Sequence, residues 1–218
     1  MNSRTLPATL PARIYLLACD VDRHRLRGQD VGVVVRGALF ADLSLRGCLV
    51  EEDGVVRPAG SRRTGDAVLD DELRIMAESE PRSWRALLRR GGKTTLAAVQ
   101  DQLASAGQIK VEHTRRLGIF PATRVTLTNP AQVAALRESV REAVRGTRPV
   151  SAVATEDAAL VALVAVGQLG SVLSAQDRRT HKARIAEFDE RGGSAVPVLR
   201  RVLRQIKAAR ASAYASGG

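Results

Sequence analysis

The sequence predicts a mainly α-helical fold: a single compact helical bundle with two short β-hairpins. Apolar residues recur at helical spacing along most of the chain, and helix-capping and helix-ending residues separate these segments. Only two short segments, around residues 48–57 and 109–127, combine β-branched residues and turns in the pattern of a hairpin. The 218 residues can bury a sizeable core, so we expect one domain over residues 1–211 and a disordered tail over 212–218.

The first two predicted helices lie in the N-terminal quarter of the chain. Pro11 stands in the first turn of a helix that continues to Leu17. After a basic loop over residues 23–28, Asp30 is expected to cap a second helix, and Gly47 suits the left-handed position that follows a helix end. The second helix is apolar almost all round, which indicates the centre of the core.

The middle of the chain alternates hairpins with helices. We expect, in order, a hairpin over residues 48–57, a helix opened by Asp66, a helix around Trp84, a helix over 94–106 and a second hairpin over 109–127. Asp53-Gly54 is typical of a two-residue hairpin turn, and Gly107 is expected to end the helix before it. The second hairpin has a long apolar tip.

Four further helices are predicted over residues 131–145, 156–166, 175–190 and 194–211. The uncharged segment 158–176 approaches the length of a membrane-spanning helix. Its second half, however, contains several Gln, Ser and Gly residues. We therefore interpret this segment as a buried core helix and its exit.

The chain is strongly basic, with 34 Lys and Arg against 23 Asp and Glu, a net charge of +11. Residues 178–210 alone hold ten basic and three acidic residues. Such a field favours polyanionic partners, either nucleic acid or an anionic membrane surface. Charge alone does not choose between them.

Metal-binding and catalytic patterns are missing from the sequence. Cys19 and Cys48 are the only cysteines and lack a CxxC spacing, so we expect buried free thiols in a reducing cytosol. His24, His113 and His181 are scattered without the spacing of metal ligands. We therefore expect a cytoplasmic protein with no metal, no cofactor and no enzymatic activity.

Arg36 is an unusual residue in the predicted second helix, because its surroundings from residue 31 to 41 are otherwise apolar. A buried guanidinium needs an anion, and Asp42, six residues on, lies on a different face of the helix. A ligand phosphate would suit the planar guanidinium. The alternatives are a carboxylate from another helix, such as Asp70 or Asp71, or a side chain that reaches the surface.

Residues 89–95 form a second candidate anion site just before the helix that we expect to start at Thr94. Glycines let backbone amides approach a ligand, and a helix N-terminus attracts anions. The segment is therefore either a phosphate-binding turn or a simple connection between helices. A nucleotide-binding loop is disfavoured, since Leu87 stands where its first glycine is required and no strand precedes it.

Two motifs in register carry a family resemblance. Residues 36–47 are RGALFADLSLRG and residues 64–73 are TGDAVLDDEL. They resemble the signatures RGxxLxELxLRG and TGDxLLDExL of the Golgi phosphoprotein 3 family, and the match in order and spacing extends from about Leu10 to Leu203. The resemblance implies a helical-bundle domain that binds phosphatidylinositol 4-phosphate and lies peripherally on membranes. The Arg- and Ala-rich composition indicates a bacterial member.

The resemblance also implies a headgroup site made by a Trp and an Arg at the start of the second helix and two basic residues near the start of the fifth. Arg36 and Lys93 match two of these positions. Arg27 stands in place of the Trp, and Leu96 in place of the second later cation. With Arg90 in the adjacent turn, we expect Arg27, Arg36, Lys93 and Arg90 to bind the lipid headgroup.

The apolar tip of the second hairpin, Leu117, Ile119 and Phe120, is expected either to enter the membrane interface or to form a homo-oligomer contact. A helix followed by a basic hairpin is also the pattern of a winged-helix DNA-binding protein. The helix over 94–106 has no Lys or Arg to contact DNA, which argues against a nucleic-acid partner. An anionic phospholipid surface is the expected partner, with an oligomeric protein-interaction scaffold as a further alternative.

Overall fold

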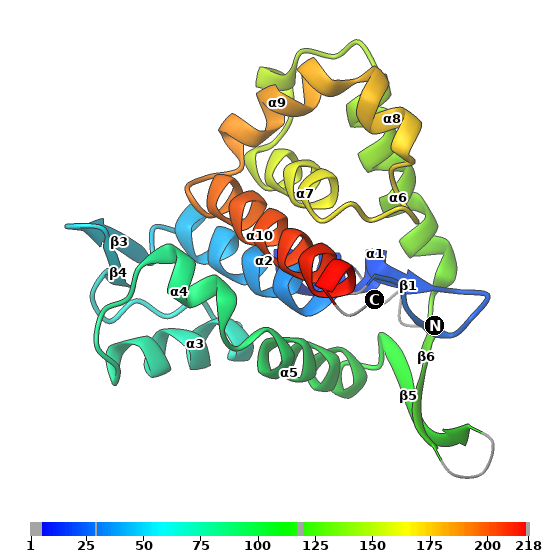
Figure 1. The fold of residues 1–218 in the computed structure, drawn as a ribbon, viewed down its shortest axis with the longest axis horizontal. Coiled ribbons are helices and arrows are strands. Elements are labelled where there is room, and N and C mark those ends of the chain that lie inside the picture. The colour runs from blue at the N-terminus through cyan, green and yellow to red at the C-terminus, as the bar shows by residue number, and fades with distance from the viewer. Residues whose placement is uncertain (1–5, 29, 117–119, 217–218) are drawn as a thin grey trace.

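The structure is a computed structural model that describes residues 6–28, 30–116 and 120–216 (Figure 1). These residues contain ten α-helices, one short 3-10 helix and three two-stranded antiparallel sheets. The predicted mainly α fold is thereby confirmed.

The helices and strands follow one another along the chain with short connections. The helices are α1 Leu10–Ala18, α2 Val31–Leu45, α3 Ala67–Ala77, α4 Trp84–Arg89, α5 Gly92–Ser105, α6 Pro130–Arg145, α7 Thr155–Val166, α8 Ala175–Thr180, α9 Lys182–Arg191 and α10 Ala195–Ser216, with the 3-10 helix at Val150–Ala152. The strands are β1 Cys19–Asp20, β2 Arg25–Leu26, β3 Leu49–Glu52, β4 Val55–Pro58, β5 Ile109–Arg116 and β6 Phe120–Leu127.

Helix α2 lies at the centre of the bundle and packs against α1, α5, α7 and α10 (Figure 1). Its buried residues cover all sides of the helix, as its apolar sequence predicts. Gly47 after its end has φ +64°, the left-handed conformation expected there. Helix α7 is buried at every residue from Ala158 to Val166, so the uncharged segment is a core helix followed by its exit. None of the helices in the described ranges combines the length and the apolar character needed to cross a bilayer.

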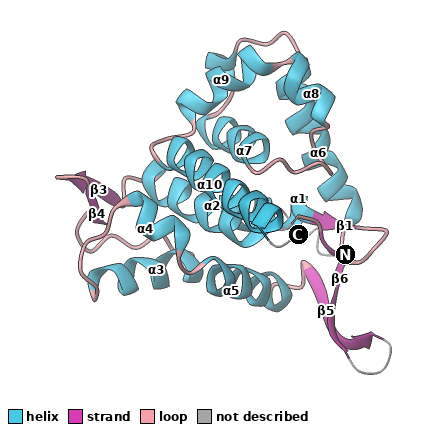
Figure 2. Ribbon diagram, viewed as in Figure 1, coloured by secondary structure: helices cyan, strands magenta, loops and turns pink. Residues whose placement is uncertain are grey.

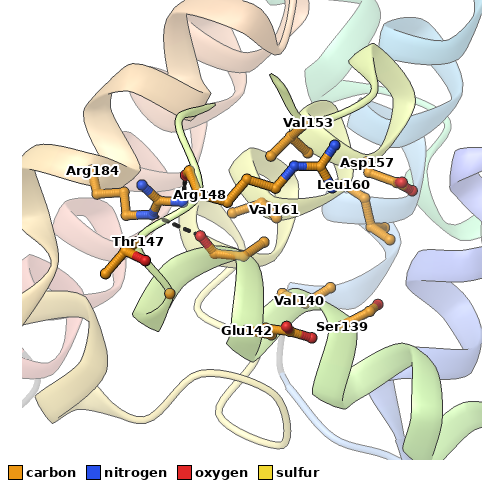
Figure 3. A pocket seen from close by; sticks show the side chains of 12 residues that line it. Ser139, Val140, Glu142, Thr147, Arg148, Val153, Asp157, Leu160, Val161 and Arg184 are labelled. Carbon is orange, nitrogen blue, oxygen red and sulfur yellow. Dashed lines mark hydrogen bonds between the residues drawn. The ribbon is translucent and has the colours of Figure 1, made fainter. Parts of the chain in front are cut away.

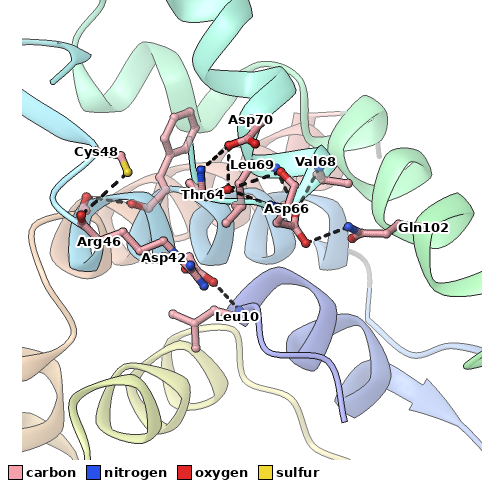
Figure 4. Close-up of polar contacts among 12 residues, drawn as sticks. Leu10, Asp42, Arg46, Cys48, Thr64, Asp66, Val68, Leu69, Asp70 and Gln102 are labelled. Carbon is pink, nitrogen blue, oxygen red and sulfur yellow. Dashed lines mark hydrogen bonds and ion pairs between the residues drawn. The ribbon is translucent and has the colours of Figure 1, made fainter. Parts of the chain in front are cut away.

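Asp42 is a buried acid that fixes α1 against α2 (Figure 4). Its carboxylate accepts a hydrogen bond from the backbone N–H of Leu10 at 2.6 Å and one from Arg46 Nε at 2.5 Å. Leu10 is the first residue of α1, where backbone N–H groups lack partners within the helix. One side chain of α2 therefore satisfies the start of the neighbouring helix.

Three features of the structure differ from the expectations. Strands β1 and β2 form a third pairing that was not expected, since two-residue strands are too short to show a periodicity. The helix expected over 175–190 is divided at His181 into α8 and α9. Helix α10 extends to Ser216, beyond Ser212, where we expected the tail to begin.

The β5–β6 hairpin projects from the helical body (Figure 2). Its base is buried at Ile109 and Leu127, which pair with each other. Of the expected tip, Leu117 and Ile119 lie outside the described residues, and Phe120 is described only by its backbone pairing with Arg116.

Both cysteines are buried and free, as expected. Burial raises the pKa of the Cys19 thiol to about 12. At neutral pH this thiol stays protonated and is therefore a poor nucleophile.

Candidate anion-binding site

Arg36 lies in the middle of α2 with only 7% of its surface exposed, and three other helices hold its guanidinium. Nη1 and Nη2 pair with the two carboxylate oxygens of Glu72 at 3.0 and 2.8 Å. Nε donates to the carbonyl oxygen of Leu87 at 2.6 Å, and Nη1 also donates to Thr95 Oγ1 at 2.8 Å. The guanidinium carbon lies 4.9 Å from the centre of the Phe40 ring. The side chain is thus enclosed and neutralised inside the protein.

This geometry contradicts the expectation that Arg36 needs the phosphate of a ligand. A carboxylate from another helix is the partner, as the alternative interpretation had it, but the residue is Glu72 rather than Asp70 or Asp71. Asp71 instead pairs with Arg74 on the exposed side of α3. Arg36 therefore acts as an internal connection between α2, α3, α4 and α5, and it offers no free guanidinium to a headgroup.

The segment that contains Glu72 is held in place by a capping network (Figure 4). Asp66 accepts hydrogen bonds from the backbone N–H groups of Val68 and Leu69, both at 3.1 Å, and caps α3 as expected. Gln102 of α5 donates to the other oxygen of Asp66 at 2.8 Å. The backbone N–H of Thr64 donates to Asp70 at 2.6 Å, which holds the pKa of that carboxyl below its ordinary value. The TGD motif is therefore structural.

The turn between α4 and α5 lies directly on the Arg36 guanidinium. Gly91 has φ +77°, and a Cβ atom there would lie 2.7 Å from the guanidinium carbon of Arg36. Glycine is required at this position both by the left-handed backbone and by the contact. Helix α5 begins at Gly92, two residues before the expected Thr94, and its N-cap residue is Gly91.

The first turns of α2 and α5 touch at two glycines. A Cβ atom at Gly32 would lie 2.8 Å from the carbonyl oxygen of Gly92 and 3.6 Å from the backbone nitrogen of Lys93. The N-cap residue is Asp30 for α2 and Gly91, which has no side chain, for α5. Two positive helix ends therefore meet at one place. We call Gly32, Gly91, Gly92 and Lys93 the α2–α5 junction.

The remaining predicted site residues are exposed near these helix starts. Lys93 belongs to the first turn of α5, and Arg90 directly precedes the junction. Arg27 follows β2 and lines a cavity of about 210 Å³ at the start of α2, together with Asp30, Val31 and Lys207. Lys207 of α10 was missed as an individual residue, although it lies in the basic C-terminal run.

A second cavity, of about 430 Å³, lies between α6, α7 and α9 (Figure 3). Its charged side chains are balanced: Glu142 and Asp157 against Arg148 and Arg184. Arg184 Nε donates to the carbonyl oxygen of Ala143 at 2.7 Å, so it holds the chain around the cavity. This cavity lacks the positive excess expected of an anion site.

The match of the chain to a protein-family model agrees with the fold and with the two sequence motifs. Residues 10–206 match the family model described as Golgi phosphoprotein 3 (GPP34). No curated protein matches the chain. The family match covers most of the sequence and includes both motifs that meet in the Arg36–Glu72 pair. The chain therefore belongs to the Golgi phosphoprotein 3 (GPP34) family.

Proposed function

We propose that this protein associates peripherally with anionic membranes, without catalysis, by contacting phosphate groups of a phosphatidylinositol 4-phosphate-like headgroup at the α2–α5 junction. The observation that carries the proposal is the meeting of two helix N-termini at Gly32 and Gly92, beside the exposed cations Arg27, Arg90 and Lys93. Backbone N–H groups and the helix dipoles favour a bound phosphate there. Lys93, Arg90 and Arg27 supply the positive charge.

In this proposal Arg36 has a structural role. Its bonds to Glu72, Leu87 and Thr95 connect the elements on both sides of the α4–α5 turn. Because a Cβ at Gly91 would contact the guanidinium, the Arg36 side chain supports the turn from beneath. It positions the backbone that meets the phosphate and does not touch the ligand.

The departures from the family pattern predict weak discrimination between anionic lipids. Arg27 replaces an aromatic residue with a second long cation, which adds charge without a stacking or insertion surface. Leu96 is half-buried against the core and offers no charge at the position of the second later cation. Binding should therefore follow the charge density of the membrane and weaken with salt.

Vesicle sedimentation tests this function. We expect Arg90→Ala with Lys93→Ala to weaken binding to phosphatidylcholine vesicles doped with phosphatidylinositol 4-phosphate by about 30-fold, since each basic residue near an anionic surface contributes about 1 kcal/mol. The control is Arg179→Ala with Arg201→Ala, which removes the same charge from exposed positions of α8 and α10. An equal loss in the control would reduce the site to a diffuse field.

The β5–β6 hairpin is the second membrane contact that we propose, and its projection from the body favours this role (Figure 2). Phe120→Asp should weaken vesicle binding about tenfold, because a charged residue is unfavourable in the membrane interface. Binding of the soluble headgroup should be unchanged. Light scattering of the same variant provides the contrasting outcome: loss of an oligomer with unchanged vesicle binding would assign the hairpin to subunit contact.

A further inference from the structure

Helices α9 and α10 form the walls of a second basic groove, which shares Gln168, Leu203 and Lys207 with the cavity beside Arg27. Both pack against α7 and diverge from the turn that joins them at residues 192–194 (Figure 1). A cavity of about 330 Å³ lies between them. We call it the α9–α10 groove; it is lined by Ala165, Val166, Gln168, Arg178, Lys182, Ile185, Ala186, Asp189, Arg200, Leu203, Arg204 and Lys207.

The groove has a large excess of positive charge. Five of its lining residues are basic and one is acidic. The acid, Asp189, pairs with Arg200, and Lys207 Nζ donates to the amide oxygen of Gln168 at 2.6 Å. Within the described part of the chain, neither Lys182 nor Arg204 pairs with an acid. Four positive charges therefore remain without a compensating carboxylate.

The C-terminal end of α7 explains only a small part of this cluster. Val166 and Gln168 line the groove where α7 ends. A helix C-terminus carries about half a negative charge, which favours nearby cations. This half charge can compensate at most one of the four uncompensated basic residues, so most of the positive charge remains unexplained. Like charges in a recessed site raise the local potential and favour an anionic ligand.

The spacing of the lining residues indicates an elongated ligand. On α10 the groove residues are Arg200, Leu203, Arg204 and Lys207, and on α9 they are Lys182, Ile185, Ala186 and Asp189. Both sets follow the same pattern of i, i+3, i+4 and i+7, which is one face of a helix about 10 Å long. A compact phosphate would reach only part of such a row.

The apolar lining residues, which we call the floor of the groove, narrow the choice of ligand further. Val166, Ile185 and Leu203 lie among the basic residues of the two walls. None of the described side chains that line the groove is aromatic, so these residues do not provide the stacking surface that single-stranded nucleic acids use. An apolar stripe flanked by acids would fit both the floor and the walls. We propose that the α9–α10 groove binds an acidic amphipathic helix of a partner protein.

A designed peptide provides a direct test without membranes. The probe is a labelled synthetic helix of about four turns with a leucine stripe flanked by glutamates, and fluorescence anisotropy measures its binding to the full chain. We expect Lys182→Glu with Arg204→Glu to weaken binding at least about tenfold, because like charges face each other across the interface. Arg179→Glu with Arg201→Glu, equal in charge but outside the groove lining, should change it less than about threefold.

A peptide of the same composition in scrambled order is the second control, and it should bind at least about tenfold more weakly because it has no apolar stripe. Equal binding of the scrambled peptide, or an equal effect of the two double variants, would overturn the proposal. Duplex DNA and anionic vesicles are also tested as competitors for the wild-type groove. If either displaces the peptide when the total negative charge it adds is lower than that of the peptide, the groove would be assigned to that ligand instead. Lys93 and Arg90 are intact in both double variants, so this result is separate from that of the membrane site.

Discussion

Replacing Glu72 by alanine is expected to lower the free energy of unfolding by about 3–5 kcal/mol, the usual cost of removing one partner of a buried ion pair. The loss is large because the guanidinium of Arg36 would stay buried with its charge uncompensated. Only the Leu87 carbonyl and the Thr95 hydroxyl would remain as acceptors for it. Urea denaturation at neutral pH, followed by circular dichroism, measures the change.

The exposed pair between Arg74 of α3 and Glu78, the residue directly after α3, is the matched control. Glu78→Ala should change stability by less than about 1 kcal/mol, since solvent screens surface ion pairs. The double variant Arg36→Leu with Glu72→Leu should be more stable than Glu72→Ala, because no unpaired charge is left.

The same variants decide the role of Arg36. If Arg36 is structural, Arg36→Leu with Glu72→Leu should retain most vesicle binding wherever the variant is folded. Loss of vesicle binding in a double variant that is as stable as the wild type would show that Arg36 contacts the headgroup after all. It would also show that the enclosed geometry gives way when lipid binds.

Most of the fold could be predicted from local patterns. Asp66 as a cap, Gly47 at a left-handed position and the apolar α2 and α7 each depend on residues close together in the sequence. Strands β1 and β2 could not be predicted in this way. Their two-residue pairing is supported by a contact with a distant strand, the hydrogen bond from Val125 N–H to the His24 carbonyl at 2.7 Å.

The partner of Arg36 was in principle within reach of the sequence. Glu72 lies three residues after Leu69 and four before Met76, so helical periodicity places it on the buried face of α3. Asp70 and Asp71 fall outside that face. What local spacing could not supply is the distance between α2 and α3, which depends on how the whole bundle packs. The choice between a ligand phosphate and an internal carboxylate as the partner of Arg36 depends on this distance.

The α2–α5 junction was only partly visible in the sequence. Gly91-Gly92-Lys93 indicated a phosphate-binding turn, but nothing near Gly32 showed that a second helix start would meet it. The contact joins residues 60 positions apart, and it is possible only because neither glycine has a Cβ atom that would keep the two helices apart. Lys207 was hidden for a similar reason: one lysine in a basic run is not distinguished until α10 is placed beside the start of α2.

Gly32→Val is expected to destabilise the protein by about 3 kcal/mol and to weaken vesicle binding at least about tenfold. Valine would place its Cβ 2.8 Å from the Gly92 carbonyl oxygen, a backbone atom that cannot rotate away. The first turns of α2 and α5 must therefore separate. Because the proposed phosphate site needs both helix ends at one place, binding should decrease even in the molecules that remain folded. Urea denaturation gives the first quantity and sedimentation with phosphatidylinositol 4-phosphate vesicles, well below the unfolding transition, gives the second.

Gly170→Ala is the control for this substitution, because a Cβ at Gly170 meets no atom within 4 Å. It should leave stability within about 0.5 kcal/mol and vesicle binding unchanged. A Gly32→Val variant that is destabilised but binds vesicles like the wild type would separate the junction from the headgroup. Binding would then depend on Arg27, Arg90 and Lys93 through their charge alone, and the two helix ends would serve only to pack α2 against α5.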